Sequence, residues 1–100
     1  MQPAEIHALL IERFTTDART LRERAQGPAR AGPSAAVSTA LAEACEAIVS
    51  LIDATAPERE ALSALGRTLD ARAAGAPEAA QPVWRGGAMR VRELLALDTP

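Results

Sequence analysis

The 100-residue sequence contains no lysine, tyrosine or asparagine, and Phe14 and Trp84 are its only aromatic residues. All eleven basic residues are therefore arginines. Without lysine there is no Schiff-base lysine and no phosphate-binding P-loop. Without tyrosine there is no tyrosine acid or nucleophile. The preference for arginine and alanine resembles the coding bias of a GC-rich genome, so we expect a bacterial protein.

The sequence also has little that indicates export or a membrane. Cys45 is the single cysteine and cannot form an internal disulfide, which suits a reducing cytoplasm. The first five residues lack the basic start of a signal peptide, and we expect no apolar run of membrane-spanning length. The net charge of −2 gives no general attraction to nucleic acid or anionic lipid. These features predict a cytoplasmic protein without membrane contact.

Large apolar side chains are scarce as well, because 24 of the 48 apolar residues are alanines. Alanine favours helices but buries little area, so the sequence predicts closely packed helices around a thin core. A thin core in one small domain raises the chance that a second subunit supplies further burial. A homodimer is therefore expected.

Apolar periodicity predicts helices and no strands. A first helix is expected at about 3–26, where small and apolar residues recur at spacings of three and four. Its expected stripe is Ala4, His7, Ile11, Phe14, Ala18, Leu21 and Ala25, widened by Ile6 and Leu10. A second helix is expected at about 34–54, with a stripe formed by Val37, Leu41, Ala44, Ile48, Leu51 and Thr55, widened by Cys45 and Ile52.

A third helix is expected at about 56–74, with Leu62, Leu65, Leu69 and Ala73 along one face. Thr55-Ala56-Pro57-Glu58 has the form of a capping box, which predicts a tight junction and an antiparallel hairpin between the second and third helices. Gly75 is expected to end the third helix as its C′ residue. Gly66, inside this helix, suggests a close helix crossing.

Residues 76–86 are expected to form a flexible connector. They contain Pro77 and Pro82 and end at the first residue of the pair Gly86-Gly87. A short fourth helix is expected at about 87–97, with Ala88, Val91, Leu94 and Leu95 on its apolar side. The fold class predicted for residues 1–100 is thus a single all-α domain, a small bundle of three main helices and a short C-terminal helix.

Trp84-Arg85-Gly86 is a W-x-G tripeptide and resembles the turn motif of the WXG family of small secreted helical hairpins. In that family the motif lies between two long helices near the middle of the chain, and the secretion signal contains a tyrosine. Here the motif lies near the end of a chain without tyrosine. We therefore do not assign the chain to that family.

Charge is unevenly distributed along the sequence. Residues 13–30 carry a net charge of +3 and residues 34–55 a net charge of −3. These complementary charges favour pairing of the first two helices, within one chain or between two. The basic segment also suggests an alternative function, a small nucleic-acid-binding regulator that uses Arg13, Arg19, Arg22, Arg24 and Arg30.

No catalytic or metal-binding pattern is evident. His7 is the single histidine, has no partner at metal-ligand spacing, and is expected at the edge of the core. Glu43 and Glu46 have no histidine near them and are expected on a solvated face. Cys45 has no basic neighbour in sequence to activate it. We expect no enzyme, no metal and no cofactor.

The leading expectation is a non-enzymatic protein-protein interaction module, such as a small adaptor, chaperone or inhibitor, that also self-associates. A last helix of about ten residues must dock on something, either its own chain, a sister subunit or another protein. Tryptophan and arginine are frequent interface hot spots. The expected partner-binding residues are Trp84, Arg85, Met89, Arg90 and Leu94.

Overall fold

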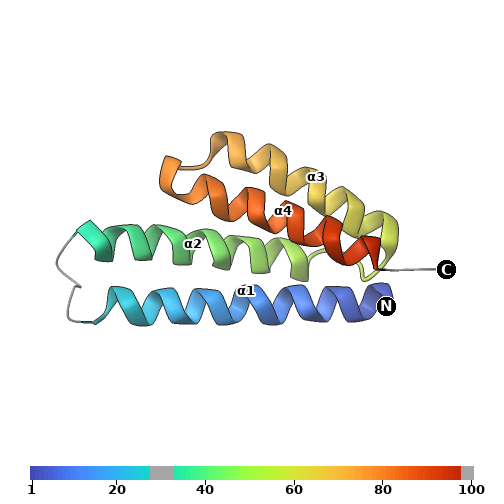
Figure 1. Cartoon of the computed structure of the whole chain (residues 1–100), viewed down its shortest axis with the longest axis horizontal. Coiled ribbons are helices and arrows are strands. Elements are labelled where there is room, and N and C mark those ends of the chain that lie inside the picture. Colours follow the sequence, from blue (N-terminus) through green and yellow to red (C-terminus); the bar gives the residue numbers. More distant parts are fainter. Residues whose placement is uncertain (28–32, 98–100) are drawn as a thin grey trace.

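The computed structural model describes residues 1–27 and 33–97 as four α-helices and one short 3₁₀ helix (Figure 1). The all-α prediction is confirmed, since the described residues contain no strand. In chain order the elements are α1 (Pro3–Ala25), α2 (Pro33–Asp53), α3 (Arg59–Gly75), η1 (Glu78–Ala80) and α4 (Gln81–Ala96).

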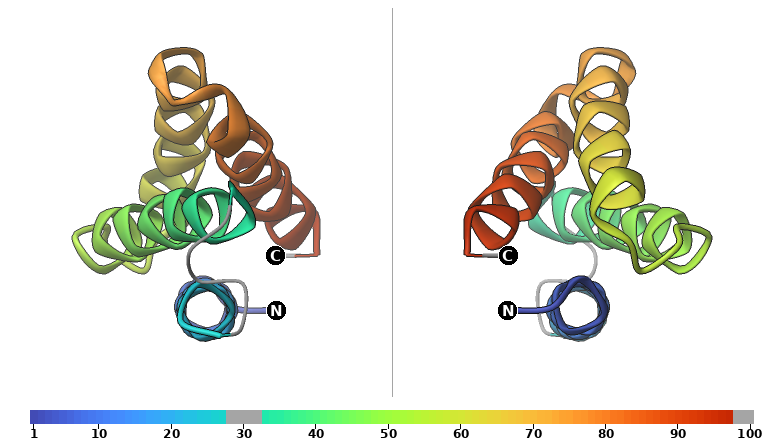
Figure 2. Two further views of the ribbon diagram at one scale, coloured as in Figure 1. Left: turned by 90° about the vertical axis from the view of Figure 1, so that its left-hand side faces the viewer. Right: turned by 90° about the vertical axis from the view of Figure 1, so that its right-hand side faces the viewer.

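The helices form two antiparallel hairpins that pack on each other. α1 pairs with α2, and α3 pairs with α4, while α2 and α3 contact each other only slightly. Figure 2 shows α1 and α2 stacked as one pair, with α3 and α4 splayed above them. The expected hairpin of the second and third helices is therefore wrong. The C-terminal helix docks on its own chain.

The junction after α2 explains that error. The Thr55 hydroxyl donates to the carbonyl of Leu51 at 2.6 Å, so it ends α2 and does not cap α3. The backbone N–H of Glu58 bonds to the carbonyl of Ala56 at 2.8 Å, and the Glu58 side chain makes no cap hydrogen bond. The predicted capping box is absent, and α3 begins at Arg59, three residues after the expected start at 56.

The last helix begins at Gln81, six residues before the expected start at 87. Most of the segment 76–86 is therefore helical, since residues 78–80 form η1 and residues 81–86 belong to α4. Pro82 lies in the first turn, where its missing N–H costs no helix bond. A proline and a glycine pair that resemble helix breaks in the sequence are thus accommodated inside one helix.

One core joins all four helices. Its α1 members are Ile6, Leu10, Phe14 and Ala18, spaced four apart. The expected stripe was displaced by about one residue at its start, because Ala4 is exposed and His7 only half-buried. In α2, Val37 is 46% exposed, and Ala42 takes a buried place that the sequence pattern did not assign. The expected apolar faces of α3 and α4 are buried as predicted: Leu62, Leu65, Leu69, Ala73, Ala88, Val91, Leu94 and Leu95.

Among the described glycines, Gly87 has the tightest surroundings. A Cβ there would lie 3.3 Å from Cζ of Phe14 and 3.4 Å from Cδ1 of Leu69. At Gly66, where the sequence suggested a close crossing, a Cβ would meet Val91 Cγ1 at an ordinary 3.6 Å. Gly75 is the last residue of α3, and no described glycine has positive φ, so the expected C′ role is wrong.

By length and composition alone, Ser34–Asp53 of α2 is apolar enough to cross a membrane. The expectation that no run approaches this length is wrong on this criterion, because alanine-rich sequence scores as apolar without large side chains. The core helix of a soluble protein meets the same criterion. In this fold Ile48 and Ile52 of α2 are fully buried, and 33% of the apolar segment is buried.

Candidate functional site: a groove between α1 and α4

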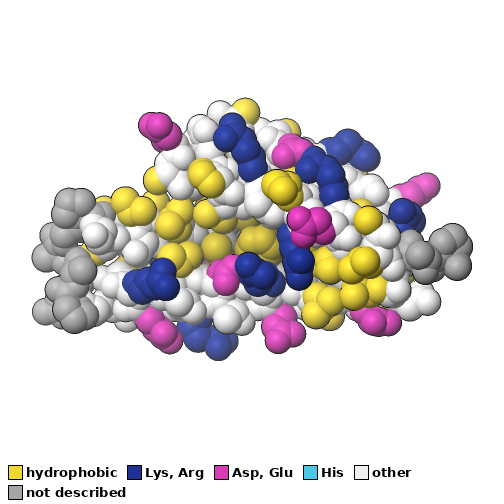
Figure 3. Space-filling model, in the orientation of Figure 1, with side chains coloured by type: hydrophobic (Ala, Val, Ile, Leu, Met, Phe, Trp, Pro, Cys, Tyr) yellow, Lys and Arg dark blue, Asp and Glu magenta, His cyan; other side chains and the backbone are white. Residues whose placement is uncertain are grey.

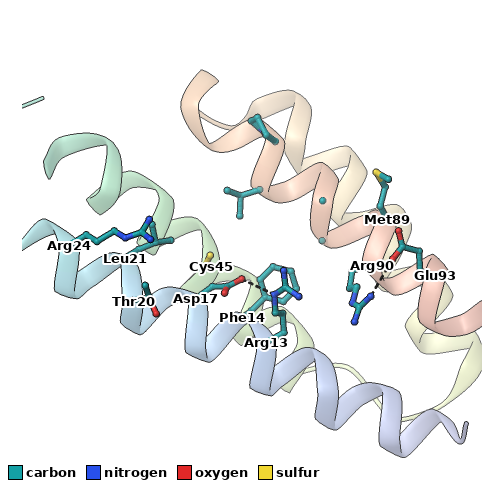
Figure 4. Close-up of a pocket in the computed structure, with 14 residues that line it drawn as sticks. Arg13, Phe14, Asp17, Thr20, Leu21, Arg24, Cys45, Met89, Arg90 and Glu93 are labelled. Carbon is teal, nitrogen blue, oxygen red and sulfur yellow. Dashed lines mark hydrogen bonds and ion pairs between the residues drawn. The ribbon is translucent and has the colours of Figure 1, made fainter. Parts of the chain in front are cut away.

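A groove of about 440 Å³ runs between α1 and α4, which contact each other only slightly (Figure 4). The two helices are antiparallel and converge where α1 begins and α4 ends (Figure 1). We call this feature the α1–α4 groove. It is lined by Arg13, Phe14, Asp17, Thr20, Leu21, Arg24, Cys45, Pro82, Val83, Gly86, Gly87, Met89, Arg90 and Glu93.

The floor of the groove is apolar and its edges are charged. Phe14, Leu21, Cys45 and Val83 supply apolar side chains from three different helices. Figure 3 shows hydrophobic side chains in the hollow between α1 and α4, with arginines and carboxylates beside them. An apolar floor with a few polar groups at the edge is typical of a binding surface.

Three arginines stand along the edges. Arg13 pairs with Asp17 at 3.2 Å and Arg90 with Glu93 at 3.4 Å, each within its own helix (Figure 4). Arg24 makes no side-chain hydrogen bond or ion pair with any residue of 1–27 or 33–97. Among the described residues, the groove therefore has one cation without a carboxylate partner, at its end near the C-terminus of α1.

Gly86 leaves part of the α4 wall bare. A Cβ at this position would meet no atom within 4 Å, so packing inside the chain does not require glycine here. Glycine in a helix interior costs about 0.5–1 kcal/mol relative to alanine. Because glycine has no side chain, the α4 backbone is accessible on the groove wall at this position.

A second hollow, of about 320 Å³, continues the groove toward its narrow end. It shares Arg13 and Arg90 with the α1–α4 groove and adds Leu9 and Leu94. The terminal ammonium of Met1 donates to the carbonyl of Leu97 at 3.3 Å, which ties the start of α1 to the end of α4. Met1, Leu9 and Leu97 are each 39–57% exposed, so this end is apolar.

The structure divides the five expected partner-binding residues into two groups. Trp84 and Leu94 lie in the core, with 7% and 4% of their surface exposed. Arg85 is exposed, and Met89 and Arg90 are exposed on the edge of the groove, with Met89 57% exposed. The sequence analysis named Arg13 and Arg24 of the α1 wall only for the nucleic-acid alternative. It missed this wall as a protein-binding surface, although residues 13, 17, 20, 21 and 24 lie at helical spacing.

Cys45 lies in the groove floor with a thiol that is hard to ionise. Burial, together with the nearby carboxylates of Asp17 and Glu46, raises the pKa of the Cys45 thiol to about 11. At neutral pH the thiol stays protonated and is a weak nucleophile.

This pKa predicts slow modification of Cys45 in the folded chain. At about pH 8, a disulfide reagent should react at least roughly tenfold faster with the urea-unfolded chain, whose thiol has an ordinary pKa near 8.5. The reaction is followed by the absorbance of the released thiol. Equal rates in the folded and unfolded chains would show that Cys45 is accessible and ionised.

His7 is half-buried, and its Nε2 lies 2.8 Å from the carbonyl oxygen of Ile52 near the end of α2. This position agrees with a histidine at the edge of the core. Within the described parts of the chain, no three histidine, cysteine or acidic residues lie close enough to hold a metal ion.

Arg22 and Glu46 join α1 to α2 through two hydrogen bonds. Arg22 Nε lies 3.0 Å from Glu46 Oε2, and Nη2 lies 2.6 Å from Oε1. The complementary charges of the first two helices thus pair within one chain. The hydrogen bond from Arg22 lowers the pKa of the Glu46 carboxyl below its usual value.

This lowered pKa gives a pH dependence with a definite sign. The ion pair contributes stability above the unfolded carboxyl pKa of about 4.3, and the contribution is lost as pH falls through the lower folded pKa. We expect Glu46→Gln to lose less stability than wild type between about pH 6 and pH 3, measured by urea unfolding. Glu43→Gln, on the same helix, should behave as wild type. A wild-type acid profile in Glu46→Gln would contradict the assignment.

The arginines of the alternative function are only partly available. Arg13 and Arg22 pair with carboxylates, although Arg13 stays exposed. Arg19 and Arg24 are exposed as well. Arg30 lies outside the described residues.

Comparison of the chain with protein-family models, with curated proteins and with solved structures gives no match. By its fold, the chain is a compact all-α domain of two packed helical hairpins with a groove between α1 and α4.

Proposed function

We propose that the chain is a non-enzymatic protein-protein interaction module, of the adaptor, chaperone or inhibitor kind. The observation that carries the proposal is the α1–α4 groove, where an apolar floor lies beside the strongly exposed Met89. His7 and Cys45 further support a non-enzymatic function. The imidazole of His7 is hydrogen-bonded to a backbone carbonyl, and the thiol of Cys45 stays protonated. A cytoplasmic location and a homodimer remain part of this proposal, and the apolar end at Met1, Leu9 and Leu97 is a surface for the dimer.

Site-specific photocrosslinking tests this proposal. A photoreactive amino acid replaces Met89 in one variant and Ala74, an exposed residue of α3, in a control. In cells that encode the protein, we expect adducts with another protein chain at position 89 and none at 74. Adducts between two copies at position 89 would place the dimer contact at the groove edge and contradict a dimer through the apolar end. Absence of protein adducts at both positions would overturn the proposal.

The nucleic-acid alternative has weaker support, because two of its five arginines are already paired with carboxylates. It requires affinity that falls steeply with salt. If the chain binds no DNA or RNA at about 50 mM salt, where such contacts are strong, the alternative is excluded.

A further inference from the structure

We propose that the α1–α4 groove binds an amphipathic helix of another protein, about three turns long, with a carboxylate that faces Arg24. The side of this helix toward the groove carries small and apolar residues. The inference rests on the proposed interaction function, because it names the surface and the kind of partner.

The length of the groove favours a helix. Its α1 wall extends from Arg13 to Arg24 and its α4 wall from Pro82 to Glu93. Each wall spans eleven residue steps, or roughly 17 Å at the helical rise. Two antiparallel helices of this length, with α2 beneath them at Cys45, leave a long depression whose shape matches a third helix.

The bare wall at Gly86 favours a close backbone approach. A Cβ at Gly86 would meet no atom within 4 Å apart from its own helix backbone, whereas a Cβ at the adjacent Gly87 would lie tightly against Phe14 and Leu69. Small residues at a crossing allow two helix backbones to approach and gain packing contacts. The apolar floor at Phe14, Leu21 and Val83 would be covered by the apolar stripe of the incoming helix.

The charge of the groove selects an acidic partner. Asp17 and Glu93 are matched by Arg13 and Arg90, so Arg24 adds one net positive charge. A carboxylate on the incoming helix would compensate Arg24 and fix the direction in which the helix lies.

A second copy of this chain is a poorer occupant. The exposed large apolar side chains of the described residues are Met1, Leu9, Val37, Met89 and Leu97. None lies in α3 and only Val37 lies in α2, while Met89 lines the groove and Leu9 lines the second hollow that continues it. No helix of the chain therefore presents a free stripe of large apolar side chains that could enter the groove of another copy.

The test is a display selection of helix-favouring peptides of sixteen residues against the full chain. We expect the enriched peptides to carry small or apolar residues three and four apart and an acidic residue near one end. Circular dichroism of a selected peptide should show helix formation on binding. Affinity is then measured by fluorescence anisotropy with the labelled peptide.

Four variants locate the bound peptide. Gly86→Leu fills the groove and should weaken binding at least tenfold, whereas Gly75→Leu, the same change at another open helical glycine, should leave it unchanged. Arg24→Gln should weaken binding about two- to fivefold, the range of an exposed ion pair. Arg72→Gln, at an exposed residue of α3 outside the groove, should not.

Other results would overturn the inference. These are selected peptides that bind Gly86→Leu as tightly as wild type, peptides that bind without helix formation, or a wild-type dimer that Gly86→Leu dissociates in sedimentation. Binding of dodecanoate without any peptide binding would assign the groove to an anionic amphiphile. If crosslinks at position 89 persist in Gly86→Leu, the interaction function stands and only the groove assignment fails.

Discussion

Trp84→Ala should lower the free energy of unfolding by about 3–5 kcal/mol, the usual cost of removing a large buried aromatic side chain. Trp84 is 7% exposed and belongs to the core shared by all four helices. Small domains have a total stability of only about 5–15 kcal/mol, so the variant should be near its unfolding threshold at room temperature. Urea unfolding followed by circular dichroism measures the change.

The adjacent residue supplies a control for this prediction. Arg85 is exposed in the same helix, and Arg85→Ala should change stability by no more than about 0.5 kcal/mol. If Trp84→Ala kept wild-type stability but abolished the crosslinks at position 89, Trp84 would be an anchor for a partner. The core assignment would then be wrong.

Gly87→Leu and Gly86→Leu should change stability in opposite directions. At Gly87 even a Cβ lies 3.3 Å from the Phe14 ring, so a leucine forces the α1–α4 contact apart. Overpacking of this kind costs about 1–3 kcal/mol and occasionally more. At Gly86 a leucine extends into open space, and the better helix former should add about 0.5–1 kcal/mol.

Urea unfolding of the two variants beside wild type measures this difference directly. The pair differs by one position in a single helix, so helix propensity is matched and only the surroundings differ. A loss of stability in Gly86→Leu equal to that in Gly87→Leu would show that the α4 wall is filled and not open. Such a result would also remove the basis for the groove proposal.

The all-α class and the apolar faces of α3 and α4 were evident from the sequence. Leu62, Leu65 and Leu69 recur at helical spacing, and this spacing by itself places them on one buried face. The association of the first two helices was also indicated, because opposite charges such as Arg22 and Glu46 occur on them in separate blocks. These are local properties of side chains along one helix or between neighbouring helices.

The tertiary structure alone decided where α4 begins and which helices pair. Pro82 and Gly86 are poor helix formers in isolation, but Trp84 and Ala88 are buried in the core, and this burial outweighs the local preference for a turn. The Thr55 hydroxyl also bonds back to α2 and not forward to α3.

The groove also required the tertiary structure. It is made by Arg24 from α1 and Gly86 from α4, which are more than sixty residues apart in sequence. Periodicity identifies the face on which each residue of a helix lies, but not which face of another helix will stand opposite it. Met89 and Arg90 were expected at a binding surface from their residue types and places in the chain, whereas their position opposite α1 follows only from the packing of the two hairpins. The sequence by itself therefore determined the helices and most of their buried faces, and the packing decided the partners of each helix and the space left between them.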